Sequence, residues 1–306
     1  MSKNLPPELR GKRFNSISDY LKEEFGKKTI KLAIDGGFTC PNRDGSKGSG
    51  GCTFCSDTGS GEFSSDIDDQ IRLLSDKWPD AAYLAYFQNH TNTYAPVEEL
   101  REKYYSILKD PRIKGLVIGT RPDCLGYEVL DLLSEINSTH FMWVELGLQT
   151  IHEKTAERIN RCYGLDEFDE AMDKLQKRGI RAVVHLILGL PGESREMMLE
   201  SVKYVASKPG LFGMKLHLMN LVKGSSLAAT DPEYVSFPDI QTYVELVVDC
   251  LELIPPSVTI HRLTGDAPRD ILISPVWSFN KRTILNSIND HLNLLDTWQG
   301  KQYTAE

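Results

Sequence analysis

Three of the six cysteines stand in one glycine- and serine-rich stretch, residues 36–63. They are Cys40, Cys52 and Cys55, and the last two form a C-x2-C pair. A stretch so rich in Gly and Ser favours turns over a helix or a central strand, so hydrophobic packing is not expected to gather these thiols. A bound metal cluster is the expected organiser of the stretch.

The number of clustered cysteines bears on the kind of metal site. A structural zinc site usually takes four protein ligands from two such pairs, and this chain has one pair. Four irons held by three thiolates leave one iron with an open position for a substrate or cofactor. Cys124, Cys162 and Cys250 stand alone and are expected to be buried or incidental thiols. A zinc-binding interaction module remains the alternative.

The residues around the cysteines carry a family resemblance. Gly-Phe-Thr-Cys-Pro-Asn-Arg-Asp-Gly and Gly-Gly-Cys-Thr-Phe-Cys-Ser resemble the YtqA/YhcC group of bacterial radical S-adenosylmethionine (SAM) proteins, relatives of HemN and Elp3. The spacing C-x11-C-x2-C departs from the superfamily's usual C-x3-C-x2-C, and Phe54 matches its aromatic residue before the last cysteine. The resemblance implies a 4Fe-4S cluster on Cys40, Cys52 and Cys55. It also implies that bound SAM is cleaved to a 5′-deoxyadenosyl radical.

The chain around this stretch alternates apolar strands with amphipathic helices. The strands are expected at 30–34, 82–88, 115–120, 142–148, 181–190 and 213–221, and each is followed by a helical pattern. Nearly continuous apolar strands of this kind predict a parallel sheet covered by helices, either an open barrel or a doubly wound sheet. The resemblance implies the α/β fold of radical SAM enzymes, a partial (β/α)6 TIM-type barrel.

We expect a single domain over residues 1–306. It comprises a lead-in over 1–29, the barrel over 30–256 and a C-terminal extension over 257–306. The extension is expected to add a seventh strand at 257–263 and a terminal helix at 277–298 that closes over the barrel.

The fourth strand places polar residues on one face. Glu145 and Gln149 share parity with Gly147, so we expect them to face the barrel lumen. A carboxylate in such a place needs a partner. The resemblance implies that both side chains contact SAM, and the alternative for Glu145 is a structural ion pair with a lysine or arginine of the barrel.

Two further segments resemble SAM-binding parts of the superfamily. His185, Gly189 and Leu190 lie in or just after the fifth strand and resemble its adenine-binding segment. Gln88 and Asn89 follow the second strand where the superfamily has Gly-Gly-Glu, which binds the SAM amino group.

Residues of the later strands are candidates for contact with substrate. Lys215 and His217 share parity and are expected to point inward, where the lysine either pairs with Glu145 or holds an anionic substrate group such as a carboxylate. Asn220, His261 and Arg262 stand at later strand ends, with structural roles as the equal alternative.

Composition limits the partners of the chain. No apolar run is long enough for a membrane span and the N-terminus has no signal peptide, so a soluble, cytoplasmic protein with no membrane partner is expected. The net charge of −8 gives no overall attraction to nucleic acid. The basic stretch 10–31, with Phe14 and Tyr20, is therefore either a local RNA-binding patch or a solvated lead-in.

The resemblance also implies a substrate and a reductant. The substrate would be a tRNA wobble uridine, whose 5-carboxymethylaminomethyl group is converted to 5-aminomethyl. The electron donor would be of the flavodoxin or ferredoxin type. A radical SAM reaction on a small metabolite or porphyrin-like molecule is the rival, and the oligomeric state is not predicted.

Overall fold

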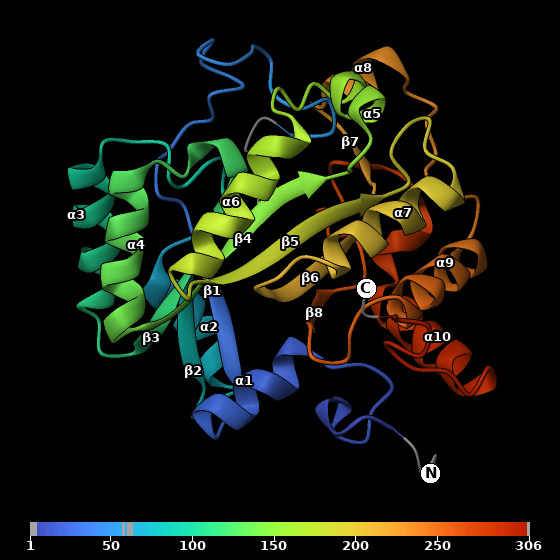
Figure 1. The fold of residues 1–306 in the computed structure, drawn as a ribbon, viewed down its shortest axis with the longest axis horizontal. Coiled ribbons are helices and arrows are strands. Elements are labelled where there is room, and N and C mark those ends of the chain that lie inside the picture. Colours follow the sequence, from blue (N-terminus) through green and yellow to red (C-terminus); the bar gives the residue numbers. More distant parts are fainter. Residues whose placement is uncertain (1–4, 57–58, 60–63, 305–306) are drawn as a thin grey trace.

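Seven parallel strands form one curled, open sheet in the computed structural model, which describes residues 5–56, 59 and 64–304 (Figure 1). The strands follow one another across the sheet in sequence order, so the sheet has no switch point and is not doubly wound. They are β1 (Thr29–Ile34), β2 (Ala82–Phe87), β3 (Ile113–Thr120), β4 (Phe141–Gln149), β5 (Arg181–Leu188), β6 (Leu211–Leu218) and β8 (Thr259–Arg262). The predicted partial barrel is confirmed, with β8 as its seventh strand.

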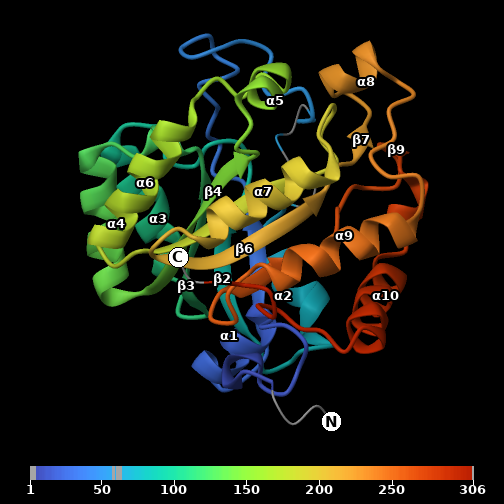
Figure 2. The same ribbon diagram turned by 45° about the vertical axis from the view of Figure 1, so that its right-hand side comes forward.

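Amphipathic helices cover the outer face of this sheet (Figures 1 and 2). In α7, for example, Ser194 accepts a hydrogen bond from the Met197 amide at the first turn, and Met198, Val202 and Val205 face the core. The helices that follow strands are α2 (Ile67–Ser75), α3 (Val97–Leu108), α4 (Tyr127–Thr139), α5 (Glu153–Arg158), α6 (Leu165–Lys177), α7 (Arg195–Ala206), α8 (Ser226–Thr230), α9 (Ile240–Glu252) and α10 (Lys281–Leu294).

The mouth of the half-barrel lies at the carboxyl ends of the strands. A small antiparallel pair, β7 (Leu221–Val222) with β9 (Leu272–Ser274), forms part of its rim. Helix α10 packs beside α9 on the flank, which corrects the expectation that the terminal helix closes over the barrel (Figure 2). The segment between β8 and β9 borders the mouth instead.

The lead-in lies at the opposite end of the barrel, below the amino ends of the strands (Figure 1). It contains a short 3-10 helix (Pro7–Leu9) and α1 (Ile17–Phe25), and Ser16 pairs with Ile260 of β8. Part of its positive charge is neutralised, since Lys12 contacts Asp19 at 2.6 Å and Arg13 contacts Asp296 at 2.8 Å. The basic stretch 10–31 is therefore not one free surface patch.

No helix in the described part of the chain has the length and apolar character that crossing a membrane requires.

Candidate functional site

A pocket of about 520 Å³ opens inside the half-barrel near the carboxyl ends of the strands. A volume of this size is typical of small-molecule sites. All seven strands of the main sheet, or the residues directly after them, contribute side chains to its wall, as the parity of inward-facing residues requires. One residue from each, in strand order, is Lys31, Gln88, Thr120, Gln149, Ile187, His217 and Arg262.

The three clustered cysteines lie on one wall of this pocket. Tight turns bring them there, since the Cys55 amide donates to the Cys52 carbonyl at 3.0 Å and the Arg43 amide donates to the Cys40 carbonyl at 2.8 Å. The Asn42 side chain also contacts the Cys52 sulfur at 3.6 Å. The three cysteines thus line one pocket, and their role as cluster ligands stays a prediction.

The Cys52 thiol is poised to ionise. A hydrogen bond from Cys55 outweighs the effect of burial and, helped by the positive charges of Arg121 and Arg161, lowers the pKa of Cys52 to about 7. The same neighbour and burial raise the pKa of Cys55 well above its usual value. A thiolate is the form that binds metal, so Cys52 is the readier metal ligand of these two thiols.

The number of thiols on this wall suits a cluster with one open iron. Within residues 5–56, 59 and 64–304, no three His, Cys, Asp or Glu side chains come close enough together to hold one metal ion. A zinc site would need four donor atoms around one point. In a four-iron cubane each thiolate binds a different iron, so the sulfurs stand further apart around a larger body. Three thiols on one wall, with the pocket on their open side, suit that arrangement.

Two buried arginines near the thiols were not anticipated. The Arg121 and Arg161 guanidinium groups lie 4.7 and 4.6 Å from the centre of the Tyr163 ring. Arg121 also contacts the Asp123 carboxylate at 2.9 Å, and Arg161 donates to the Leu148 carbonyl at 3.0 Å. Strand parity does not predict where the side chains of loop residues point. The position of Arg121 directly after β3 could nevertheless have indicated that it lies near the site.

The predicted SAM-contacting residues divide into two groups. Phe54, Gln88, Gln149 and His185 line the pocket, and Gln149 ends β4 with a φ of 71°. Asn89 is buried beside this wall without lining it, and its side-chain amide donates to the Ser64 hydroxyl at 3.3 Å. The roles of these residues toward SAM stay predictions.

Gly189 and Leu190 lie outside the pocket lining. Strand β5 ends at Leu188, and Gly189 turns away with a φ of 85°. Its amide donates to the Met198 sulfur and its carbonyl accepts from the Tyr234 hydroxyl, so both backbone groups are occupied. Leu190 packs in an apolar cluster with Ile187 and Met219, which do line the pocket. Contact of Gly189 or Leu190 with SAM stays a prediction.

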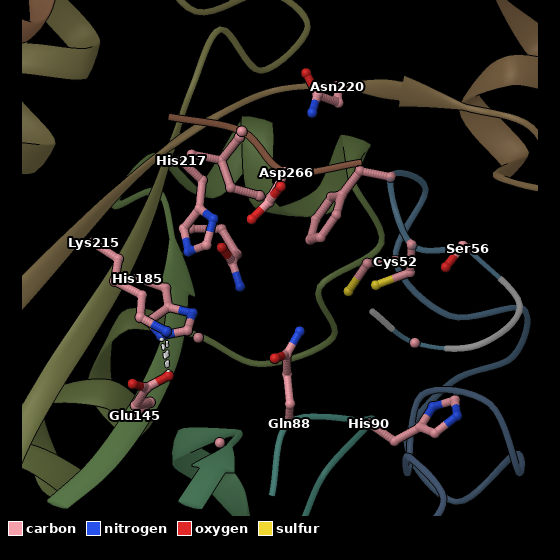
Figure 3. Close-up of a pocket in the computed structure, with 18 of the residues that line it drawn as sticks. Cys52, Ser56, Gln88, His90, Glu145, His185, Lys215, His217, Asn220 and Asp266 are labelled. Carbon is pink, nitrogen blue, oxygen red and sulfur yellow. Dashed lines mark hydrogen bonds and ion pairs between the residues drawn. The ribbon is translucent and has the colours of Figure 1, made fainter. Parts of the chain in front are cut away.

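Glu145 lies at the lumen end of the pocket, fully buried (Figure 3). Its carboxylate accepts from Lys215 Nζ at 2.5 Å, from His185 Nε2 at 3.0 Å and from Trp143 Nε1 at 3.0 Å, and Lys31 Nζ lies 3.6 Å away. Burial disfavours the charge, but Lys215 and Lys31 together outweigh it and hold the pKa of Glu145 well below its usual value. Glu145 therefore points inward, as its place in the strand predicts, and it forms the ion pair that was the alternative to SAM contact. Its contact with SAM stays a prediction.

The substrate candidates also divide. Lys215, His217, Asn220 and Arg262 line the pocket. His261, which precedes Arg262 in β8, does not line it; its ring packs 5.2 Å from Trp143 and 5.7 Å from Phe212, measured between ring centres. Its Nε2 shares a 2.9 Å hydrogen bond with the Thr259 hydroxyl, and its buried Nδ1 has no partner among the described residues. A contact of His261 with substrate stays a prediction.

Comparison with known proteins agrees with this geometry. Residues 42–205 match the model of the radical SAM superfamily, and residues 212–293 match that of the radical SAM C-terminal domain. YtqA of Bacillus subtilis is 46% identical over 95% of this chain and 92% of its own length. YhcC of Escherichia coli is 37% identical over 92% of this chain and 93% of its own length.

Two further matches are more distant. A tRNA uridine(34) acetyltransferase of Dehalococcoides mccartyi is 30% identical over 51% of this chain and 34% of its own length. The solved structure of the archaeal Methanocaldococcus infernus Elp3 superposes with a TM-score of 0.65 at 17% identity, over 89% of this chain and 64% of that one. The Elp3 likeness is one of fold.

Proposed function

The chain belongs to the radical SAM superfamily, and we propose that it cleaves SAM to modify the wobble uridine of tRNA. The reaction would convert 5-carboxymethylaminomethyl-(2-thio)uridine to 5-aminomethyl-(2-thio)uridine. The observation that carries the proposal is the convergence of Cys40, Cys52 and Cys55 on a lumen pocket that all seven strands line. Catalytic sites of barrels of this type lie at the same end of the strands.

The residues of this pocket fit the implied cofactors. Cys40, Cys52 and Cys55 would hold the 4Fe-4S cluster, which with SAM bound at its open iron supplies 5′-deoxyadenosyl radical chemistry. Gln88 and Gln149 present side-chain amides into the same pocket, and amides both donate and accept hydrogen bonds, as the amino-acid and ribose parts of SAM require. The barrel wall orients the ligands and limits their contact with water.

The tRNA substrate is supported by one of the relatives. The name of the tRNA uridine(34) acetyltransferase places its action on uridine 34 of tRNA, and its similarity to this chain covers about half of the chain. The same pocket would also admit a small metabolite or a porphyrin-like molecule, which is the rival substrate class. A flavodoxin or ferredoxin-type protein would supply the electron.

Nucleoside analysis of tRNA from a deletion strain separates these substrates. We expect 5-carboxymethylaminomethyl-uridine species to accumulate while the aminomethyl products disappear. Complementation with the wild-type gene should restore the profile, and complementation with the Cys52→Ala gene should not. An unaltered tRNA profile would contradict the tRNA proposal and leave the small-metabolite class.

A further inference from the structure

The lumen end of the pocket holds nitrogen-bearing side chains from neighbouring strands. In the register of the sheet, the neutral His185 pairs with the cation Lys215, and Lys215 pairs with the cation Arg262. Residues opposite one another on neighbouring strands point to the same face. All three line the pocket, and Lys31 of β1 reaches the same end.

Carboxylates do not balance these cations. Lys31 and Lys215 share the single carboxylate of Glu145. Arg262 lies 3.5 Å from Asp266, which Lys281 also contacts at 2.9 Å. Four cations thus share two carboxylates among these described residues.

Positive charge that is buried without a counter-charge is costly. Burial lowers the pKa of Lys31 and of Lys215 even though Glu145 opposes the shift, and Arg262 lowers both further. Each lysine would therefore gain from a second anion nearby. The lumen end offers electrostatic attraction that no described side chain satisfies.

His217 adds an unused polar atom at the same end. Its ring centre lies 4.9 Å from that of His185, and its buried Nε2 has no hydrogen-bond partner among the described residues. Figure 3 shows this imidazole between the Glu145 group on one side and Cys52 on the other. Buried polar atoms are nearly always hydrogen-bonded, so an unpartnered one facing a pocket points to a missing ligand.

We propose that Lys31, Lys215 and Arg262 form a subsite for a carboxylate at the end of the substrate that lies away from the cysteines. A backbone phosphate of RNA has chain on both sides and does not fit the closed end of a lumen, whereas a terminal carboxylate on a side group does. The identity of this group rests on the proposed function, under which it is the carboxylate of the 5-carboxymethylaminomethyl group.

Binding to the reconstituted holoprotein with SAM tests this subsite by calorimetry. The probes are the nucleoside 5-carboxymethylaminomethyluridine, its counterpart 5-aminomethyluridine, N-benzylglycine and inorganic phosphate. The wild-type protein should bind the carboxylate-bearing nucleoside about tenfold or more tighter than its counterpart, the factor expected for one charged hydrogen-bonded contact. N-benzylglycine should compete with that nucleoside.

Three variants complete the test. Lys215→Met removes the central cation but also a partner of Glu145, so its folding must be checked. Arg262→Gln is the milder change, since the Arg262 side chain is 28% exposed. Arg262→Gln should weaken binding of the carboxylate-bearing nucleoside by about tenfold and leave the affinity for 5-aminomethyluridine unchanged. Lys281→Gln is the matched control, because Lys281 shares Asp266 with Arg262 without lining the pocket, and it should bind as the wild type does.

The outcomes separate this inference from the proposed function. N-benzylglycine binding that depends on Arg262, together with an unaltered tRNA profile in the deletion strain, would keep the carboxylate subsite and reject the tRNA substrate. Three results would overturn the subsite. The wild-type protein could bind the two nucleosides with equal affinity, or it could fail to bind N-benzylglycine. Arg262→Gln could also lose affinity for both nucleosides equally. Inorganic phosphate that competes better than N-benzylglycine would reassign it to phosphate.

Discussion

Cys52 and Cys124 differ in their electrostatic surroundings. Cys52 has its pKa lowered to about 7, whereas burial raises the pKa of Cys124 to about 12. Cys124 also faces a separate hollow that contains Thr93 and Tyr94. A thiol kept protonated is a poor metal ligand, so Cys52 is the readier of these two to bind metal.

Cysteine substitution should therefore affect iron binding selectively. Anaerobically reconstituted wild-type protein should bind about four irons per chain. Cys40→Ala, Cys52→Ala and Cys55→Ala should each abolish stable loading, because a cubane then keeps only two protein thiolates. Iron and sulfide assays measure the effect, and Cys124→Ala is the control with full loading. Normal iron content in Cys40→Ala would refute the long C-x11-C spacing.

His185 should make folding stability depend on pH. Burial and the charge of Lys215 lower the pKa of His185 to about 4, while Glu145 opposes the shift. The unfolded chain, with a histidine pKa near 6.5, then binds the proton more readily than the folded protein does. The contribution of neutral His185 is complete above about pH 6.5 and is lost as pH falls toward 4, by about 3 kcal/mol at most.

Urea unfolding of the protein between pH 7 and 4 measures this loss. His185→Asn should flatten the decline in stability relative to the wild type. His140→Asn, at the end of α4 and away from the lumen, should leave the decline unchanged. Parallel curves for the wild type and His185→Asn would show that His185 protonates in the folded state as easily as in the unfolded chain.

At the scale of elements, strand periodicity predicts the fold and much of the lumen. Parity alone assigns Glu145, His185, Lys215 and His217 to the inward face, and all of them line the pocket. Parity works there because neighbouring residues of a strand must point to opposite faces. Parity predicts which face a side chain takes and makes Lys215 a possible partner of Glu145, but it does not decide between that ion pair and a contact with a ligand.

The same method predicts less where strands end. It does not predict that Gly189, in the turn after β5, takes a φ of 85° and directs its backbone to Met198 and Tyr234. Parity also misses Arg121 and Arg161, because loop conformation decides their direction. The contact of Arg121 with Tyr163 joins segments about forty residues apart, and no local pattern encodes such an arrangement.

The lead-in has a structural role that its basic composition did not indicate. Gln299 is fully buried; its side chain accepts from the Asn15 amide at 2.9 Å and donates to the carbonyls of Pro255 and Val258 at 2.7 and 2.8 Å. One amide thus joins the lead-in, the C-terminal segment and the turn before β8.

Gln299→Ala should lower the free energy of unfolding by about 2–4 kcal/mol, because three hydrogen bonds are removed and buried backbone groups remain unpaired. Gln241→Ala, on the exposed side of α9, is the matched control and should change stability by about 0.5 kcal/mol or less. Denaturant melts of the two variants test the difference. A shift for Gln299→Ala as small as the control's would show that water replaces its hydrogen bonds.

At the scale of the whole molecule, charge is distributed unevenly between the two ends of the barrel. The chain carries a net charge of −8, so tRNA binding needs a local group of cations. The lead-in cations lie at the end away from the pocket, and Lys12 and Arg13 among them form ion pairs. The mouth has three exposed cations whose partners are uncharged groups. Arg158 and Lys223 donate to the carbonyls of Pro191 and Asp270, and Arg269 lies over the Phe279 ring.

These three mouth cations form no ion pair with a carboxylate in the described part of the chain, so they keep their charge available to phosphates. A tRNA whose wobble base enters the pocket must also pass its backbone over this rim. If the proposed substrate is right, the triple variant Arg158→Ala, Lys223→Ala, Arg269→Ala should bind tRNA more weakly and with a shallower salt dependence. The slope of log K against log salt should fall by about 0.7–0.9 for each phosphate that the variant no longer neutralises.

The triple variant Lys12→Ala, Lys27→Ala, Lys28→Ala removes the same number of charges from the opposite end of the barrel and controls for net charge. It should retain the wild-type affinity and slope, because a phosphate bound there would lie too far from the pocket to accompany a base inside it. Filter binding or fluorescence anisotropy across a salt series measures both quantities. Loss of binding in the lead-in variant with none in the rim variant would place the RNA on the wrong end of the barrel for the chemistry proposed, and would count against tRNA as the substrate.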